Sequence, residues 1–259
     1  MKTLAVMLAL VFVVSGVKAK VKIEPVEYRQ GSTVLEGYIA YDASVKTPRP
    51  GVVIVHDWMG VSDYVKMRAE QIVKLGYVAF VADIYGKGVR PKNQQEASEQ
   101  AGKFRADRSL MRARAQAAVD ELKKRSVVDP KRLAAMGYCF GGGVALELAR
   151  SGADLAGVIS FHGNLDTPNP EDAKNIKGSV LVLHGADDPY VKAEVVQAFQ
   201  DEMRNARVDW QFVSYGGAVH AFTQAGAGDD PSKGAAYNAL ADKRSFEEMK
   251  RFLREIFGK

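Results

Sequence analysis

The only cysteine of the chain stands in the segment Gly137-Tyr138-Cys139-Phe140-Gly141, in a setting typical of a nucleophile. The segment has the form Gly-x-nucleophile-x-Gly and lies between a predicted strand and a predicted helix. Such a turn strains the backbone of its central residue, so the residues two places away must be small. The helix that follows directs its N-terminus at the sulfur and favours the thiolate. The amide of Phe140 can then bind an oxyanion.

Histidine and aspartate side chains follow in the order that a catalytic triad on such a turn requires, with the acid before the base. His220, in the segment YGGAVHAF, comes after the last predicted strand and is the expected base. The segment HGADDPYV offers Asp187 and Asp188 as the acid. We favour Asp188, with Asp187 as a surface charge or a turn cap. The carboxylate would orient the imidazole so that its other nitrogen faces the sulfur.

Three further histidines, His56, His162 and His184, lie at the ends of predicted buried strands. We interpret them as braces that hold loops by hydrogen bonding. The histidines lack ligand spacing such as His-x-x-x-His, so the sequence predicts no metal site. The glycine-rich segment also lacks the spacing of a dinucleotide-binding loop or a P-loop, and we expect no organic cofactor.

Short β-branched runs alternate with helical patterns from residue 50 to the end of the chain. We expect strands at 52–56, 77–83, 132–136, 157–163, 179–185 and 209–215, and helices at 62–75, 94–125, 143–150, 191–205 and 235–257. Two antiparallel strands, 21–28 and 33–41, precede them and are joined by a turn. The pattern predicts one α/β domain over residues 20–259, with a mostly parallel sheet covered by helices on both faces.

The first nineteen residues, MKTLAVMLALVFVVSGVKA, differ from the rest. Lys2 precedes the apolar run Leu4–Val14, and small residues before position 20 suit a signal peptidase. The run is short for a bilayer span, and an uncleaved anchor is the alternative. We therefore predict a protein exported to the periplasm or the medium, without stable membrane association after cleavage. Since the cysteine has no disulfide partner, stability must come from a packed core.

The composition is that of an ordinary globular protein, with 47% hydrophobic residues and a net charge of +5. A denser basic run, Arg105–Arg125, falls on a helical pattern. We interpret this run as a solvated helix face, so no nucleic-acid partner is expected.

The motifs GYCFGG, HGADDPYV and GGAVHAF, in that order, resemble the dienelactone hydrolase family of α/β-hydrolases. The resemblance runs from about residue 30 to the C-terminus. It implies an α/β-hydrolase fold in which Cys139 is the nucleophile, His220 the base and Asp188 the orienting acid. The segment HDWMG at 56–60 is similar to the family's loop after the third strand. By that resemblance, Asp57 interacts with the resting cysteine and Trp58 supplies the second oxyanion amide.

Two positions depart from the pattern of the family's best-known members. Those members carry glutamate where this chain has Asp57, which is one methylene shorter. They also hold a substrate carboxylate with arginines, and one of those positions is Gln224 in this chain. The position of the family's other arginine lies near Arg90 and Arg105 in this sequence. We take Arg105 and Gln224 as candidate substrate-binding residues.

The predicted reaction is hydrolysis of a small ester or lactone, of the carboxymethylenebutenolidase type, through a thioester on Cys139. One alternative is a small-molecule binding protein that keeps the scaffold without catalysis. The other is a thiol redox protein. The lack of a second cysteine disfavours the redox alternative, because a sulfenic acid at Cys139 would find no thiol partner within the chain.

Overall fold

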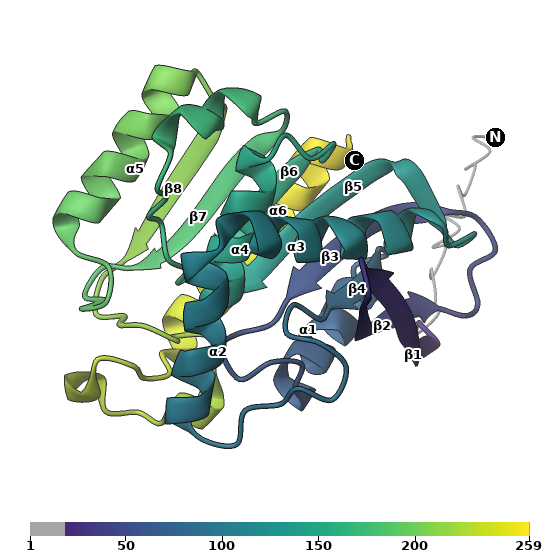
Figure 1. The fold of residues 1–259 in the computed structure, drawn as a ribbon, viewed down its shortest axis with the longest axis horizontal. Helices are drawn as coiled ribbons and strands as arrows, with labels where there is room; N and C mark the ends of the chain where they lie inside the picture. The colour runs from purple at the N-terminus through teal and green to yellow at the C-terminus, as the bar shows by residue number, and fades with distance from the viewer. Residues whose placement is uncertain (1–18, 259) are drawn as a thin grey trace, which may run out of the picture.

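One mixed sheet of eight strands, in the order β1-β2-β4-β3-β5-β6-β7-β8, runs through the computed structural model, which describes residues 19–258 (Figure 1). The strands are β1 Val21–Gln30, β2 Thr33–Asp42, β3 Arg49–Val55, β4 Val78–Ala82, β5 Val128–Tyr138, β6 Gly157–Phe161, β7 Ser179–Gly185 and β8 Trp210–Tyr215. The helices are α1 Asp63–Lys74, α2 Gln94–Ala106, α3 Arg108–Lys123, α4 Phe140–Arg150, α5 Ala193–Ala206 and α6 Ala239–Phe257.

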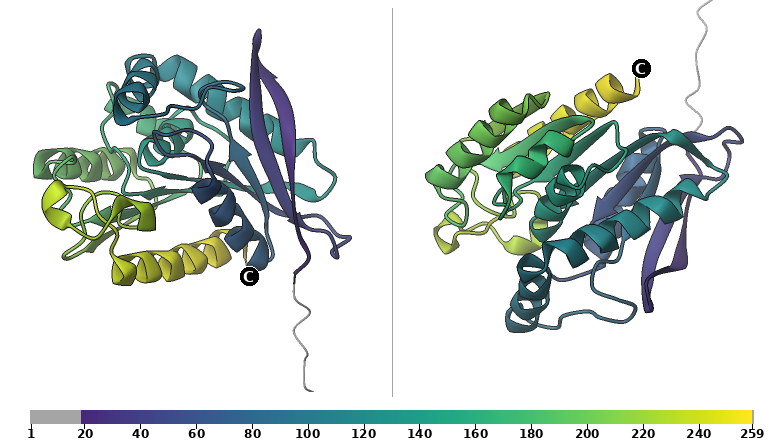
Figure 2. Two further views of the ribbon diagram at one scale, coloured as in Figure 1. Left: turned by 90° about the horizontal axis from the view of Figure 1, so that it is seen from below. Right: turned by 45° about the horizontal axis from the view of Figure 1, so that its top comes forward.

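The N-terminal hairpin provides the antiparallel part of the sheet. Strand β1 pairs antiparallel with β2, which pairs antiparallel with β4, and all later pairs are parallel. Both views of Figure 2 place this hairpin at one end of the molecule and α5 at the other. The prediction of a mostly parallel sheet with antiparallel N-terminal strands is confirmed, and the architecture is that of the α/β-hydrolase fold.

The buried strands are apolar on both faces because each face is covered by helices. In β3, Val53 and Val55 belong to the core that lies under α3 and α4, whereas Val52 and Ile54 belong to the core under α1 and α6. Figure 1 shows α2, α3 and α4 in front of the sheet and α1 and α6 behind it. This arrangement explains the continuous β-branched run in β3, since alternate side chains of a strand point to opposite faces.

Three helix predictions differ from the structure by more than two residues. The pattern over 94–125 is two helices, because the side chain of Asp107 accepts a hydrogen bond from the amide of Leu110 and starts α3. The last helix begins at Ala239, where Asn238 caps it through the amide of Ala241. Helix α4 begins at Phe140 rather than at residue 143, so its N-terminus lies directly at the cysteine.

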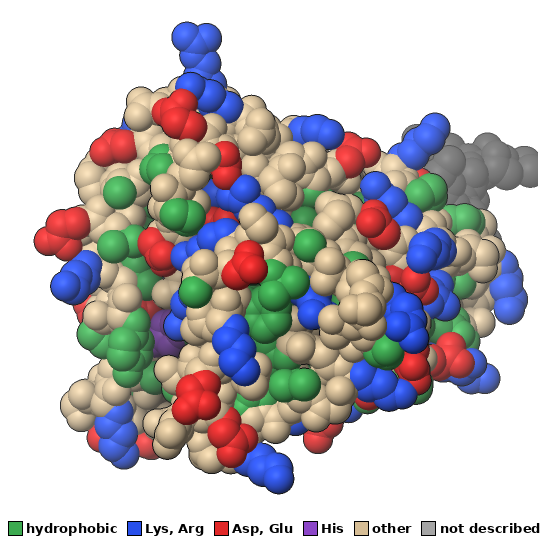
Figure 3. All heavy atoms as spheres, viewed as in Figure 1, with side chains coloured by type: hydrophobic (Ala, Val, Ile, Leu, Met, Phe, Trp, Pro, Cys, Tyr) green, Lys and Arg blue, Asp and Glu red, His purple; other side chains and the backbone are tan. Residues whose placement is uncertain are grey.

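The basic run over α2 and α3 is more than a solvated face. Arg112 pairs with Glu147 and Asp172, and Arg114 is buried with a hydrogen bond to the hydroxyl of Thr33. Arg108 pairs with Asp166. The arginines in these pairs are neutralised locally, and on the face drawn in Figure 3 basic and acidic side chains are interspersed. The expectation of no nucleic-acid partner stays a prediction.

The predicted signal segment lies outside the described residues, apart from Ala19. None of the helices that the structure describes is long and apolar enough to cross a membrane.

Candidate active site

Cys139 occupies the turn between β5 and α4, as the sequence predicts. Its φ of 54° lies in the left-handed region, which a non-glycine residue adopts at a cost. A Cβ atom at Gly137 would lie 2.0 Å from the carbonyl oxygen of Gly141. At Gly141, a Cβ would lie 2.4 Å from the carbonyl oxygen of Val55. Only glycine fits at either position, so the small residues of the motif are required for the turn to close.

Side chains from three segments meet at this turn. The Nε2 atom of His220 lies 3.0 Å from the Sγ atom of Cys139. The Nδ1 atom of the same ring lies 2.8 Å from the Oδ2 atom of Asp188. The other oxygen of Asp188 accepts a hydrogen bond from the amide of Tyr190, at 2.9 Å, which fixes the carboxylate. The contacts form a nucleophile–base–acid chain in the geometry of a catalytic triad.

The electrostatics of the site favour a charged imidazole. Burial opposes protonation of His220, but Cys139 and Asp188 outweigh it and raise the pKa of His220 to about 10. At neutral pH the ring is therefore an imidazolium that can donate both of its protons, one to Asp188 and one to the sulfur. Cys139 retains 9% of its surface, so the site is nearly closed but reachable.

Comparison with known proteins agrees with this geometry. Residues 35–257 match the model of the family described as "Dienelactone hydrolase family". The chain belongs to this family. A crystal structure described as a "Dienelactone Hydrolase-like Promiscuous Phospotriesterase P91 from Metagenomic Libraries" is 40% identical, with a TM-score of 0.88 over 92% of this chain and 99% of that one.

Two sequence relatives carry names that refer to lactone chemistry. A protein of Saccharolobus solfataricus named "Putative carboxymethylenebutenolidase" is 25% identical over 84% of this chain and 93% of its own. A Bradyrhizobium protein named "Probable 2-oxo-3-(5-oxofuran-2-ylidene)propanoate lactonase" is 29% identical over 72% of this chain and 79% of its own.

The two amides expected to form an oxyanion hole belong to segments that lie against each other in this dienelactone hydrolase family member. Phe140 is the first residue of α4, and Trp58 lies in the loop after β3. The close approach of the turn to the carbonyl of Val55 brings the end of β3 against the start of α4. The hydroxyl of Tyr85 donates to the carbonyl of Trp58 at 2.9 Å and holds the loop. Tyr85 was not predicted, although it lies three residues after the end of β4, in the segment DIYG.

Asp57 and Gln224 contact each other. The Nε2 atom of Gln224 donates to the Oδ2 atom of Asp57 at 2.7 Å, and the amide of Met59 donates to the Oδ1 atom at 2.7 Å. The structure thus gives Asp57 two hydrogen-bond donors, while its role at the resting Cys139 stays a prediction. It also links the loop that carries His220 to the loop that carries Trp58.

The arginines considered for substrate binding are each held by other residues of the protein. The Nη2 atom of Arg105, an exposed residue of α2, donates to the Oδ1 atom of Asn164 at 3.0 Å. Arg90 donates to the carbonyl of Val89 and lies 3.8 Å from the carboxylate of Asp83. Both side chains have partners of their own, so recruiting either to a substrate requires an exchange of contacts.

The remaining histidines are buried, and two of them brace loops as the sequence predicts. The Nε2 atom of His56 accepts from the amide of Ile84, so its Nδ1 atom donates to the carbonyl of Asp57, at 2.6 Å. His162 contacts Thr223. His184 differs, since its Nδ1 atom is buried without a hydrogen-bond partner among the described residues, and a bracing bond at this atom is not found.

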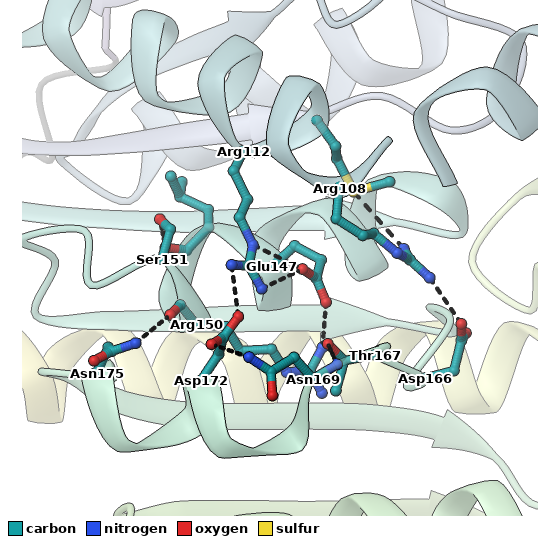
Figure 4. A network of polar contacts seen from close by, with 12 residues as sticks. Arg108, Arg112, Glu147, Arg150, Ser151, Asp166, Thr167, Asn169, Asp172 and Asn175 are labelled. Atoms are coloured by element: carbon teal, nitrogen blue, oxygen red, sulfur yellow. Dashed lines mark hydrogen bonds and ion pairs between the residues drawn. The ribbon is translucent and has the colours of Figure 1, made fainter. Parts of the chain in front are cut away.

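A buried ionic network, not foreseen from the sequence, fixes α4, the helix that follows Cys139 (Figure 4). Glu147 and Arg150, both of α4, are almost fully buried, and the Nη1 atom of Arg150 lies 3.0 Å from the Oε1 atom of Glu147. Arg150 also pairs with Glu202 of α5 at 2.7 Å and donates to the carbonyl of Leu165 at 3.0 Å. Glu147 also forms an ion pair with Arg112 of α3, at 2.8 Å. The network joins three helices and the loop after β6, which together support the turn at the cysteine.

Proposed function

We propose that this protein hydrolyses small carboxylic esters or lactones by transferring their acyl group to Cys139. The observation that carries the proposal is the unbroken contact from Asp188 through His220 to the Sγ atom of Cys139, on a strained turn at a helix N-terminus. The names of the lactonase and carboxymethylenebutenolidase relatives support lactones and related esters as the substrate class.

The reaction follows from the charge state of the site. The thiolate of Cys139 attacks the carbonyl carbon, and the amides of Phe140 and Trp58 stabilise the oxyanion, each such donor contributing about 2.7–4 kcal/mol. When the acyl C–O bond breaks, the Nε2 atom of His220 protonates the leaving alkoxide, which stays attached to the acyl group if the substrate is a lactone. Neutral His220 then takes a proton from water as the water attacks the thioester, and the thiolate leaves with the carboxylic acid formed.

A panel of small esters, lactones and thioesters tests the proposal. The native protein should turn over at least some of them, and intact mass measurement should detect an acyl group on Cys139. Cys139→Ala should abolish turnover and acylation while leaving the circular dichroism spectrum unchanged. His220→Ala should lose most of the activity. Unchanged turnover in Cys139→Ala would refute the assignment of the nucleophile.

The same measurements separate the alternatives. A binding protein on this scaffold would show substrate-dependent stabilisation without turnover or acylation. A thiol redox protein would gain oxygen at Cys139 on exposure to peroxide but no acyl group from esters.

A second candidate reaction is the hydrolysis of neutral phosphotriesters. It is favoured by the 40% identical structure, whose description names a promiscuous phosphotriesterase. The thiolate of Cys139 would attack phosphorus in place of carbon, and His220 would protonate the alkoxide that leaves. Water that gives a proton to the now neutral His220 would then cleave the S–P bond, which releases the dialkyl phosphate and restores the thiolate. Turnover of an aryl dialkyl phosphate that disappears in Cys139→Ala would support the reaction.

We also propose that the protein is exported and cleaved after Ala19, on the basis of the apolar run Leu4–Val14. N-terminal sequencing of the protein from its native host should then begin at Lys20. Recovery of the intact N-terminus from the membrane fraction would favour the uncleaved anchor.

A further inference from the structure

His162 lies between the nucleophile and the loop that carries the base. It follows β6, is fully buried, and has a φ of 38°. Its Nδ1 atom lies 3.2 Å from the backbone nitrogen of Cys139, whose N–H is shared with the carbonyl of Phe161 at 3.0 Å. Its Nε2 atom lies 2.7 Å from the hydroxyl oxygen of Thr223. One ring therefore contacts the backbone of the nucleophile and a side chain three residues beyond His220.

The hydrogen-bond partners fix one tautomer of this ring. The amide of Cys139 can only donate, so the Nδ1 atom of His162 must be unprotonated. The Nε2 atom then carries the proton and donates it to Thr223. Burial lowers the pKa of His162 well below its ordinary value, and the nearby His220 lowers it further. The ring is thus neutral, and it adds no second positive charge beside the imidazolium of His220, 5.3 Å away between ring centroids.

The far end of the link is anchored on two helices. The hydroxyl of Thr223 lies 2.7 Å from that of Tyr64 in α1. Arg68, also in α1, donates to the carbonyl of Thr223 at 2.7 Å and pairs with Asp242 in α6 at 2.7 Å. These contacts hold Thr223 in place. The hydrogen bond from His162 to Thr223 can therefore fix the position of the His162 ring.

The link joins segments whose backbones are strained. Of the four described non-glycine residues with positive φ, three lie here: Cys139 at 54°, His162 at 38° and Ala221 at 57°. Such conformations persist only where the surrounding contacts enforce them. The contacts of His162 connect the segment of Cys139 directly to the segment of Ala221.

We propose that His162 is a positioning residue for the catalytic pair. As a neutral imidazole it ties the backbone of Cys139 to Thr223 and thereby sets the 3.0 Å separation between the sulfur and the Nε2 atom of His220. It touches neither the sulfur nor the substrate in this role. The proposal rests on the proposed function only in the measurement of turnover. Alkylation of Cys139 tests it independently, because the pairing of the sulfur with His220 also governs the reaction with an alkylating agent.

Thr223→Val and Thr223→Ser form a matched pair that tests the link. Valine removes the hydroxyl at nearly constant volume, whereas serine keeps it. We expect Thr223→Val to slow the alkylation of Cys139 by iodoacetamide near neutral pH by about tenfold and to shift its pH profile to higher pH, because the thiolate is the reactive form. Thr223→Ser should keep the native profile. With an ester substrate, kcat should fall by up to about 100-fold and KM should change less, as expected for a misplaced reacting group.

His162→Asn provides a second, independent variant. Asparagine tolerates positive φ and can still accept from the amide of Cys139, but it is too short to reach Thr223. It should reproduce the shifted profile of Thr223→Val, and the double variant should lose little more than either single one, since both break the same link. If Thr223→Val fails to fold, this variant carries the test.

Two results would overturn the proposal. One is a native alkylation profile in Thr223→Val and in His162→Asn. The other is a double variant whose loss is the full sum of the two single losses. A native protein without ester turnover, combined with shifted profiles in the variants, would instead refute the proposed function and leave the positioning role standing.

Discussion

Replacement of Asp188 by asparagine changes the charge of the triad while keeping its shape. The Oδ2 atom of Asp188 lies 2.8 Å from the Nδ1 atom of His220, and its Oδ1 atom accepts from the amide of Tyr190. In Asp188→Asn the carbonyl oxygen can keep the bond to Tyr190, which leaves the amide nitrogen to face His220. Because that group donates, the Nδ1 atom must give up its proton, and the imidazolium loses its acceptor.

The size of the effect follows from the charge state of His220. Its pKa is raised from 6.5 to about 10 by Cys139 and Asp188 together, against the effect of burial. At about 1.36 kcal/mol per pKa unit this corresponds to roughly 5 kcal/mol in favour of the imidazolium. If Asp188 supplies about half of this stabilisation, its loss costs about 2–3 kcal/mol, which lowers the population of the imidazolium by about 30-fold to 160-fold. In this variant the neutral ring of His220 carries its proton on Nε2, so Nε2 cannot accept a proton from water. This wrong tautomer raises the expected loss of kcat towards about 10⁴-fold.

Asp187→Asn is the matched control. Asp187 is adjacent and exposed, and its carboxylate accepts from the amide of Gly217 at 2.9 Å rather than from the imidazole. Initial rates with a p-nitrophenyl ester, together with the NMR titration of His220, should show a large loss and a lowered pKa in Asp188→Asn alone. Equal activity of the two variants would refute the assignment of Asp188 as the orienting acid.

Three further predictions concern the turn, the oxyanion loop and pH. Gly137→Ala should abolish turnover, since its Cβ would lie 2.0 Å from a backbone oxygen. Gly143→Ala should keep most of it, because its Cβ would lie 3.3 Å from the nearest backbone oxygen, a close contact that a small shift relieves; comparable activities would contradict the packing argument. Tyr85→Phe should lower kcat by about tenfold with a smaller change in KM, and an unchanged kcat would exclude the tyrosine as a support of the loop. Because the pKa of His220 is raised, its stabilising charge is present at and below pH 6.5 and lost as pH rises through about 10. The melting temperatures of the native protein and Cys139→Ala should therefore converge towards that pH, and a constant difference would contradict the pairing.

The fold and the triad could be predicted because their signals are local or ordered along the chain. A β-branched run such as 52–56 marks a strand that is covered on both faces, whatever packs against it. The glycines that flank Cys139 are typical of the turn, and an acid followed by a base later in the chain supports that interpretation. The order selects His220 as the base, and the run that begins at Asp188 favours this residue over Asp187 as the acid. These inferences need no knowledge of which loops meet in space.

The contacts that support the site could not be predicted because they join residues far apart in sequence. Asp57 and Gln224 are separated by 167 positions, and each could be placed near the cysteine only by resemblance. His162 could be interpreted as a brace, but its partners on both sides depend on how two loops pack. The division of the helical pattern at Asp107 was missed for a simpler reason, since an aspartate inside an apolar periodicity can be a surface residue or a cap.

The loop that carries His220 is held by two consecutive residues that follow it, Thr223 and Gln224. These contacts explain how the loop can keep the imidazole within hydrogen-bonding distance of the sulfur. Thr223 contacts His162, beside the nucleophile, while Gln224 contacts Asp57, beside the expected oxyanion amide of Trp58. A movement of the loop that improves one contact must therefore strain the other. Because the two contacts lead to different segments, the positions of His220, the backbone of Cys139 and the loop of Trp58 depend on one another.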